Sequence, residues 1–160
     1  MFTGIVKSVG SVKTLEEDHL LISTDDDNFY NLEKGTSISI DGCCLTLREY
    51  IDNNLLFQIS DETISRTSLN KDHCGYVNME LPLTVNSLLS GHIVQGHVDG
   101  VIELYEVIKL DNELWNFYFK YADEKYIVDK GSITINGISL TVVEPAKDKF
   151  SVAVIEETYK

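Results

Sequence analysis

One stretch of the chain reads Lys34-Gly35-Thr36-Ser37-Ile38-Ser39-Ile40-Asp41-Gly42-Cys43-Cys44-Leu45-Thr46-Leu47. A second copy follows downstream as Lys130-Gly131-Ser132-Ile133-Thr134-Ile135-Asn136-Gly137-Ile138-Ser139-Leu140-Thr141-Val142. In each copy an Asp-Gly or Asn-Gly pair separates two short apolar runs, which is a strong local signal for a β-hairpin. The stretch therefore predicts two strands joined by a two-residue turn, once in each half of the chain.

A further block repeats in the same order. Residues 57–63 are matched by residues 152–158, at nearly the same distance from the hairpin in both copies. Matched blocks in one order and at nearly constant spacing indicate a duplication, and the period is too long for a solenoid. We predict two copies of one small domain, the first formed by residues 1–86 and the second, incomplete copy by residues 87–160.

Strand-like runs separated by turn residues recur along both copies. We expect strands at residues 2–13, 20–23, 37–40, 43–50, 55–60, 75–81, 93–108, 114–121, 132–136, 138–144 and 149–155. Ser60 followed by acidic residues predicts the start of a short helix. The pattern predicts an all-β fold of barrels, since closure removes exposed sheet edges. The second copy has no counterpart of the strand at 75–81, so we expect one open edge there.

Composition narrows the class of partner. The chain has 160 residues and a formal net charge of −13 at pH 7. We predict no nucleic-acid or membrane partner, because both favour a positive surface. The three cysteines lack CxxC spacing, which argues against a metal site and is typical of reduced thiols. The N-terminus has no signal-peptide pattern and no apolar run is long enough to span a bilayer, so we expect a cytoplasmic protein.

Four motifs, taken together and in order, resemble the riboflavin synthase family. They are Met1-Phe2-Thr3-Gly4-Ile5-Val6, Asp41-Gly42-Cys43-Cys44-Leu45-Thr46, Gly91-His92-Ile93-Val94-Gln95-Gly96-His97-Val98-Asp99-Gly100 and Asn136-Gly137-Ile138-Ser139-Leu140-Thr141-Val142. The resemblance runs from Met1 to Lys160. It implies two tandem homologous six-stranded Greek-key β-barrels that bind lumazine, with the second barrel lacking its last strand in this chain.

The resemblance also implies a reaction. Each barrel is expected to bind one 6,7-dimethyl-8-ribityllumazine, and one lumazine gives a four-carbon unit to the other. The products are riboflavin and 5-amino-6-ribitylamino-uracil, and the family uses no metal or other cofactor. Its active site forms between the N-terminal barrel of one subunit and the C-terminal barrel of its neighbour in a homotrimer. Lumazine synthase is a further expected partner. The family continues past Lys160 into a last strand and a trimerisation helix.

Family positions carry over onto both copies. The expected catalytic residues are Phe2, Cys44, His97 and Ser139. The expected substrate-binding residues are Gly4, Ile5, Val6, Cys44, Leu45, Thr46, Gln58, Ile59, Ser60, Asp61, Glu62, Thr63, Gly96, His97, Val98, Lys130, Ser139, Leu140, Thr141, Ala153, Val154, Ile155, Glu156, Glu157 and Thr158. The family usually has a proline where Glu156 stands.

Each candidate has a structural alternative. His97 suits proton transfer because the unperturbed pKa of histidine is near neutrality, yet a histidine between glycines also fits an ordinary turn. Cys44 is either a nucleophile or a small packed side chain, since only the thiolate is reactive. Lys130 is either a ligand donor or a turn lysine like Lys34. Ser139 repeats the strand position of Cys44, which fits a pocket wall in each copy.

Two alternatives to the enzyme stay open. The same fold serves as a non-catalytic lumazine or flavin carrier, and fold alone does not separate carrier from enzyme. A shortened, inactive barrel protein is the other alternative. Pocket-like residues in both copies, together with His97 and Ser139, favour the enzyme.

Overall fold

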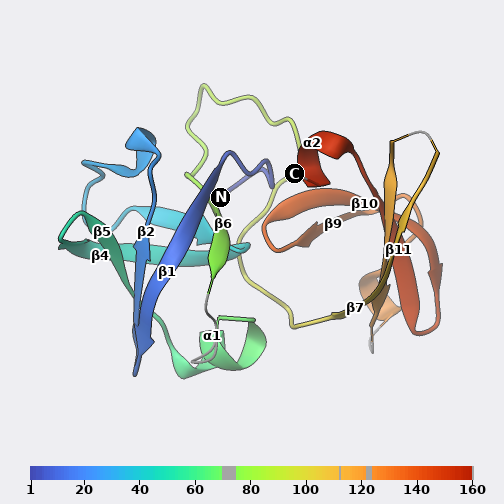
Figure 1. The fold of residues 1–160 in the computed structure, drawn as a ribbon, viewed down its shortest axis with the longest axis horizontal. Coiled ribbons are helices and arrows are strands. Elements are labelled where there is room, and N and C mark those ends of the chain that lie inside the picture. The colour runs from blue at the N-terminus through green and yellow to red at the C-terminus, as the bar shows by residue number, and fades with distance from the viewer. Residues whose placement is uncertain (70–74, 112, 122–123, 160) are drawn as a thin grey trace. The chain divides into compact units, whose positions relative to one another are not determined.

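The computed structural model describes residues 1–69, 75–111, 113–121 and 124–159. Its internal contacts divide the chain into two units (Figure 1). The first unit comprises Met1–Val101 with Thr134–Ile138, and the second comprises Ile102–Ile133 with Ser139–Lys160. Residues 87–101 thus share contacts with the first unit, whereas the boundary predicted at residue 86 follows the sequence repeat and stays a prediction.

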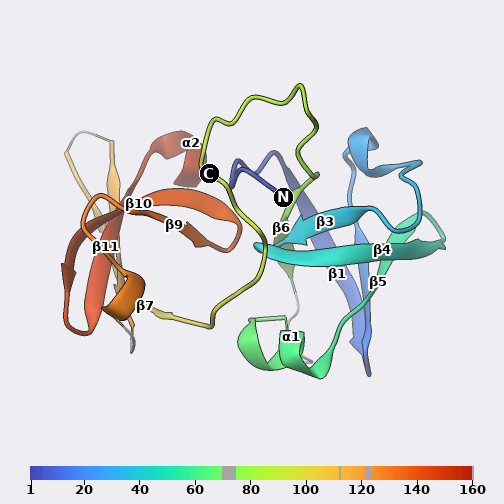
Figure 2. The same cartoon turned by 180° about the vertical axis from the view of Figure 1, so that it is seen from behind.

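The first unit is built on a closed six-stranded barrel, seen from two sides in Figures 1 and 2. The strand order is β1-β2-β5-β4-β3-β6, and β6 closes the barrel by pairing with both β1 and β3. The strands are β1 (Ser8–Glu16), β2 (His19–Ser23), β3 (Ser37–Ile40), β4 (Cys43–Ile51), β5 (Asn54–Gln58) and β6 (Tyr76–Glu80). The predicted strands are confirmed, except that the first begins at Ser8, and Phe2 forms only an isolated bridge with Val94.

Alternation along β4 separates the barrel interior from its outer face. Cys43, Leu45 and Leu47 are buried, whereas Cys44 is half-buried and Thr46 and Arg48 are exposed. This is the period of two that a half-buried strand requires. The inward row joins one apolar core with residues of the other strands, including Leu20, Ile22, Ile38, Ile40, Leu55, Phe57, Val77 and Met79. Burial of this core is the main driving force for folding.

The turns follow from their residues. Asp41 and Gly42 have φ values of 46° and 82°, and the matching Asn136 and Gly137 have 46° and 81°. Two successive positive φ angles define the hairpin turn that suits the twist of antiparallel strands. Both predicted hairpins are therefore confirmed.

Helix α1 (Asp61–Arg66) begins where the sequence predicts. The Ser60 side chain accepts a hydrogen bond from the Thr63 amide at 3.2 Å, which caps the helix start. A short 3-10 helix, η1 (Asp27–Phe29), is capped in the same way by Asp26. The side chains of Ser60 and Asp26 thus accept hydrogen bonds from amides in the first turn of each helix, which have no partner within the helix.

The remaining strands form an open sheet in the order β7-β8-β11-β10-β9. They are β7 (Glu103–Lys109), β8 (Trp115–Lys120), β9 (Ser132–Ile135), β10 (Ile138–Ala146) and β11 (Lys149–Val154), with η2 (Glu124–Tyr126) and α2 (Glu156–Tyr159). The order repeats β1-β2-β5-β4-β3. Among the residues that the structure describes, no strand takes the place of β6, as predicted. Strand β7 begins at Glu103, later than the predicted residue 93, and all its residues are exposed.

Candidate functional site

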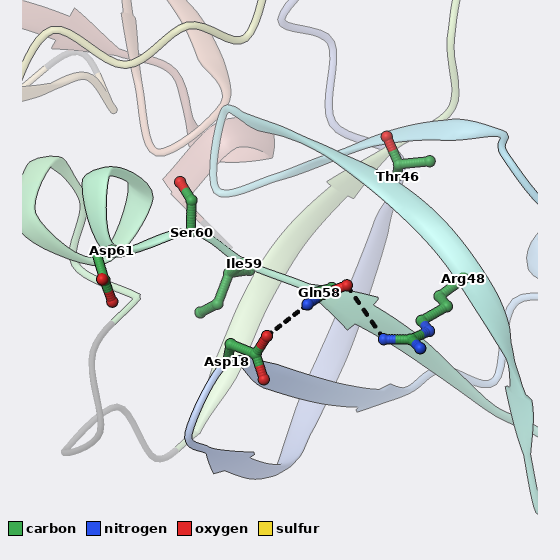
Figure 3. A pocket seen from close by; sticks show the side chains of 7 residues that line it. All are labelled: Asp18, Thr46, Arg48, Gln58, Ile59, Ser60 and Asp61. Carbon is green, nitrogen blue, oxygen red and sulfur yellow. Dashed lines mark hydrogen bonds between the residues drawn. The ribbon is translucent and has the colours of Figure 1, made fainter.

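A pocket of about 680 Å³ lies on the outer face of the barrel (Figure 3). Its volume falls within the usual range for small-molecule sites. The outward row of β4, the end of β5 and the start of α1 supply most of its wall. The lining residues are Asp18, Thr46, Arg48, Gln58, Ile59, Ser60 and Asp61. Five of these seven, all but Asp18 and Arg48, are predicted ligand residues.

The Gln58 amide is held from both ends (Figure 3). Its Nε2 donates to Asp18 Oδ2 at 2.5 Å, and its Oε1 accepts from Arg48 Nη1 at 3.1 Å. The hydrogen bond from Gln58, with a smaller contribution from the nearby His19, holds the pKa of Asp18 below its usual value. The pocket therefore presents carboxylate, amide and guanidinium groups in a fixed order, which suits a ligand rich in hydroxyl and carbonyl groups.

Sequence reasoning missed Asp18 and Arg48. Arg48 lies two residues after Thr46, so strand alternation alone places it on the same outer face. Asp18 precedes β2 and reaches the site because the Ile59 amide donates to its carbonyl oxygen at 2.8 Å. Only the pairing of β2 with β5 gives that contact, and no local pattern in the sequence indicates it.

Three predicted motifs meet in the first unit. Phe2 is fully buried, and its amide donates to the Val94 carbonyl oxygen at 2.7 Å. The Val94 amide donates back to Phe2 at 3.0 Å. Two residues on, the Gly96 carbonyl oxygen accepts from the Cys44 amide at 2.8 Å. Backbone contacts thus join the N-terminal motif, the hairpin strand and the histidine motif, where His97 is exposed.

The two adjacent cysteines have different surroundings. Cys43 faces the core and is 6% exposed, and burial, with a smaller effect of Cys44, raises the pKa of its thiol to about 11. Cys44 is half-buried on the outer face. Cys44 is therefore the cysteine of the pair whose thiol is placed on the same side as the pocket wall.

This difference predicts slow alkylation of Cys43. Burial hides its sulfur, and the raised pKa lowers its thiolate fraction at neutral pH about 100-fold. We expect iodoacetamide to modify Cys43 at least 100-fold more slowly in the folded protein than in urea, as measured by peptide mass spectrometry. Cys44 in the same digest is the internal control and should react faster than Cys43. Equal rates for Cys43 in both states would contradict the prediction.

The predicted residues of the second unit lie on β10, β11 and α2. Ser139 is half-buried, Thr141 exposed and Val142 buried, so the change from exposed Thr46 to buried Leu47 on β4 recurs at Thr141 and Val142. Glu156 is the first residue of α2. Proline is well tolerated at the first position of a helix, so the glutamate there is compatible with the same local structure.

The pocket wall of the first unit has a different counterpart in the second. Strand pairing joins Val154 to Trp115, as Ile59 is joined to Asp18 in the first unit. Trp115 therefore stands in the position of Asp18. In the same register, Val143 replaces Arg48 and Ala153 replaces Gln58. Trp115 stacks on Tyr159 with ring centroids 3.8 Å apart. Three polar side chains in the wall of the first unit thus have apolar or aromatic counterparts in the second, whereas Thr141 and Glu156 keep the polar character of Thr46 and Asp61.

Lys130 lies in a turn. Its φ is 62°, its side chain is exposed, and its amide donates to the Val142 carbonyl oxygen at 3.1 Å. Lys34, its counterpart in the repeat, instead has its Nζ 3.5 Å from Glu49 Oε2. The predicted role of Lys130 in ligand binding stays a prediction.

Within the described parts of the chain, no three histidine, cysteine or acidic side chains are grouped so as to hold a metal ion. No described helix is both long enough and apolar enough to cross a membrane.

Comparison with known proteins gives concordant relatives. The lumazine binding domain matches residues 3–82 and 95–160. A riboflavin synthase of Actinobacillus pleuropneumoniae is 34% identical over 166 residues, covering 100% of this chain and 77% of the relative. A riboflavin synthase of Chlamydia pneumoniae is 35% identical over 165 residues, covering 99% of this chain and 80% of the relative.

Solved structures with the same fold hold ligands. A crystal structure of LumP complexed with riboflavin has a TM-score of 0.84 at 25% identity, covering 99% of this chain and 89% of that chain. LumP complexed with 6,7-dimethyl-8-(1'-D-ribityl) lumazine has a TM-score of 0.81 at 26% identity, covering 98% and 88%.

Proposed function

The chain belongs to the riboflavin synthase family of lumazine-binding domain proteins, and we propose that it carries out the reaction that gives the family its name. Two molecules of 6,7-dimethyl-8-ribityllumazine would yield riboflavin and 5-amino-6-ribitylamino-uracil by transfer of a four-carbon unit. The observation that carries the proposal is the backbone contact of Cys44 with Gly96, which brings two of the family motifs together beside the buried Phe2.

The proposed reaction needs a base, a nucleophile and hydrogen-bond donors. A methyl group of one lumazine must lose a proton, a nucleophile must add to the other ring, and donors must spread the developing negative charge. We assign proton transfer to the exposed imidazole of His97 and to bound water, with Ser139 as a further polar group. Cys44 and Thr46 line the ring site, and holding two rings in register supplies much of the rate enhancement.

The proposal includes the setting of the reaction. Residues 1–86 and 87–160 would each form one lumazine-binding domain. The paired site would lie between the N-terminal domain of one subunit and the C-terminal domain of its neighbour in a homotrimer. A cytoplasmic location and contact with lumazine synthase complete the proposal.

A second candidate function is binding without turnover. LumP has the same fold and has been crystallised with riboflavin and with the ribityl lumazine. The Asp18–Gln58–Arg48 arrangement also favours this candidate, because it offers hydrogen bonds to a ribityl chain or a ring carbonyl.

One experiment separates the two functions. The purified protein is mixed with 6,7-dimethyl-8-ribityllumazine, and riboflavin is followed by absorbance and fluorescence. Riboflavin appearing at an enzymatic rate, with two lumazines consumed for each riboflavin, supports the synthase. Altered lumazine fluorescence without riboflavin supports the binding protein. A lumazine that neither binds nor reacts would overturn both candidates.

A further inference from the structure

The Glu80 carboxylate holds two residues of the N-terminal segment of the first unit. Glu80 Oε1 accepts from the Thr3 amide at 2.8 Å and from the Thr3 hydroxyl at 2.6 Å. Its Oε2 accepts from the Gly4 amide at 3.0 Å. Both carboxylate oxygens are therefore engaged by two consecutive residues of the N-terminal segment.

The anchor itself is rigid. Glu80 ends β6 and pairs with Ser39 of β3, so its backbone belongs to the closed barrel. Thr3 is only 6% exposed and Gly4 is buried. Hydrogen bonds to an ionised acceptor are stronger than neutral ones, and the effect is larger where water is excluded. The segment before β1, which contains no strand of its own, is thus held at Thr3 and Gly4 by this carboxylate, in addition to the backbone hydrogen bonds of Phe2 with Val94 and of Thr3 with His92.

The segment held by Glu80 carries predicted site residues on both sides. Before Thr3 lies Phe2, which pairs with Val94. After it come Gly4, which is held directly, and the half-buried Ile5 and Val6. The Thr3 hydroxyl links Glu80 to Ile5 as well, since it also accepts a hydrogen bond from the Ile5 amide at 3.1 Å. A shift of the Thr3 backbone would therefore move the whole N-terminal part of the predicted site.

We propose that Glu80 is a positioning residue of the ligand site in the first unit. Its carboxylate sets the backbone at Thr3 and Gly4, so that residues 4–6 face the ligand in a binding orientation. The inference rests on the proposed function, because it takes residues 4–6 as ligand-contacting. Glu80 itself is not assigned any contact with the ligand.

The test is Glu80→Gln. Glutamine has nearly the same shape as glutamate, but one of its two terminal groups is an NH2 donor. That donor would face the amide of Thr3 or Gly4, which is also a donor, so one hydrogen bond is lost. We expect 6,7-dimethyl-8-ribityllumazine to bind about tenfold more weakly in a fluorescence titration, because small displacements of positioning groups have large effects at ligand sites. Glu80→Asp, which keeps the charge and both acceptors, should recover part of the affinity.

Tyr50→Phe is the matched control. The Tyr50 hydroxyl donates to the Phe29 carbonyl oxygen at 2.8 Å and accepts from the Leu32 amide at 3.0 Å. It thus also fixes an irregular segment to the barrel, but that segment contains no predicted site residue. We expect Tyr50→Phe to lower the melting temperature and leave the lumazine affinity unchanged.

The outcomes are separable. If the wild type binds lumazine and Glu80→Gln binds it equally well, the positioning role is wrong and the proposed function stands. Equal weakening by Glu80→Gln and Tyr50→Phe would show that both act through stability alone and would also overturn the positioning role. A wild type that binds no lumazine would overturn the proposed function, and this inference with it.

Discussion

Replacing Gly96 with alanine is expected to lower the free energy of unfolding of the first unit by about 2–4 kcal/mol. A Cβ at this position would lie 2.6 Å from Cys44 Cβ, 2.9 Å from its amide nitrogen and 3.1 Å from its Cα. These atoms belong to a paired strand and have little room to move. Gly96 also has a φ of 83°, which a residue with a Cβ adopts at a cost. Urea unfolding followed by circular dichroism measures the change.

The same substitution should abolish lumazine binding, because the clash separates the histidine motif from β4. Gly35→Ala is the matched control. Gly35 has a similar φ of 91°, but a Cβ there would meet no atom within 4 Å. Gly35→Ala should lower the free energy of unfolding by about 1 kcal/mol, the cost of a positive φ alone, and should leave lumazine binding unchanged. A Gly96→Ala protein no less stable than Gly35→Ala would show that the close approach of Gly96 to Cys44 is unimportant.

Local chemistry made much of the fold predictable. The Asp41-Gly42 and Asn136-Gly137 pairs specify hairpins because their residues tolerate positive φ. Ser60 predicts the start of α1 because its hydroxyl caps a free amide. No described residue of the second unit corresponds to β6, as the repeat alone predicts, since Lys160 matches Ser65 and β6 begins only at Tyr76 in the first unit.

The parts of the site that depend on long-range register were not predictable. Asp18 meets Gln58 across 40 residues, and Glu80 meets Thr3 across 77. Neither residue belongs to a motif, and each is an ordinary surface acid when judged by its neighbours in sequence. What places them is the pairing of β2 with β5 and the position of β6 in the barrel.

The two copies of the duplicated domain have kept their interior more closely than their outer wall. Leu47 and Phe57 in the barrel core correspond to Val142 and Val152, which are also buried and apolar. On the outer wall, by contrast, the pair Asp18 and Arg48 becomes Trp115 and Val143. Core packing restricts which residues fit at the inward positions of a strand. Residues at the outward positions can differ according to the ligand that each copy binds. In the proposed reaction two identical molecules take different roles, and unlike walls are one way to hold them so.

Phe57→Ala is expected to have the largest effect on stability, about 3–5 kcal/mol. The ring is fully buried, and Phe57 pairs with Leu20 on one side and Leu47 on the other. Its removal leaves a cavity in the barrel core that these neighbours, fixed in paired strands, fill only in part. Urea unfolding gives the free energy.

Ile51→Ala is the control for Phe57→Ala, since Ile51 ends β4 with 44% of its surface exposed. The same kind of truncation there should cost less than about 1 kcal/mol. Because Phe57 precedes Gln58 on β5, a barrel that collapses around the cavity should also weaken lumazine binding. A Phe57→Ala protein as stable as Ile51→Ala would mean that the closed barrel is not the cooperative core of the first unit, and that the pocket on its outer face is supported by other contacts.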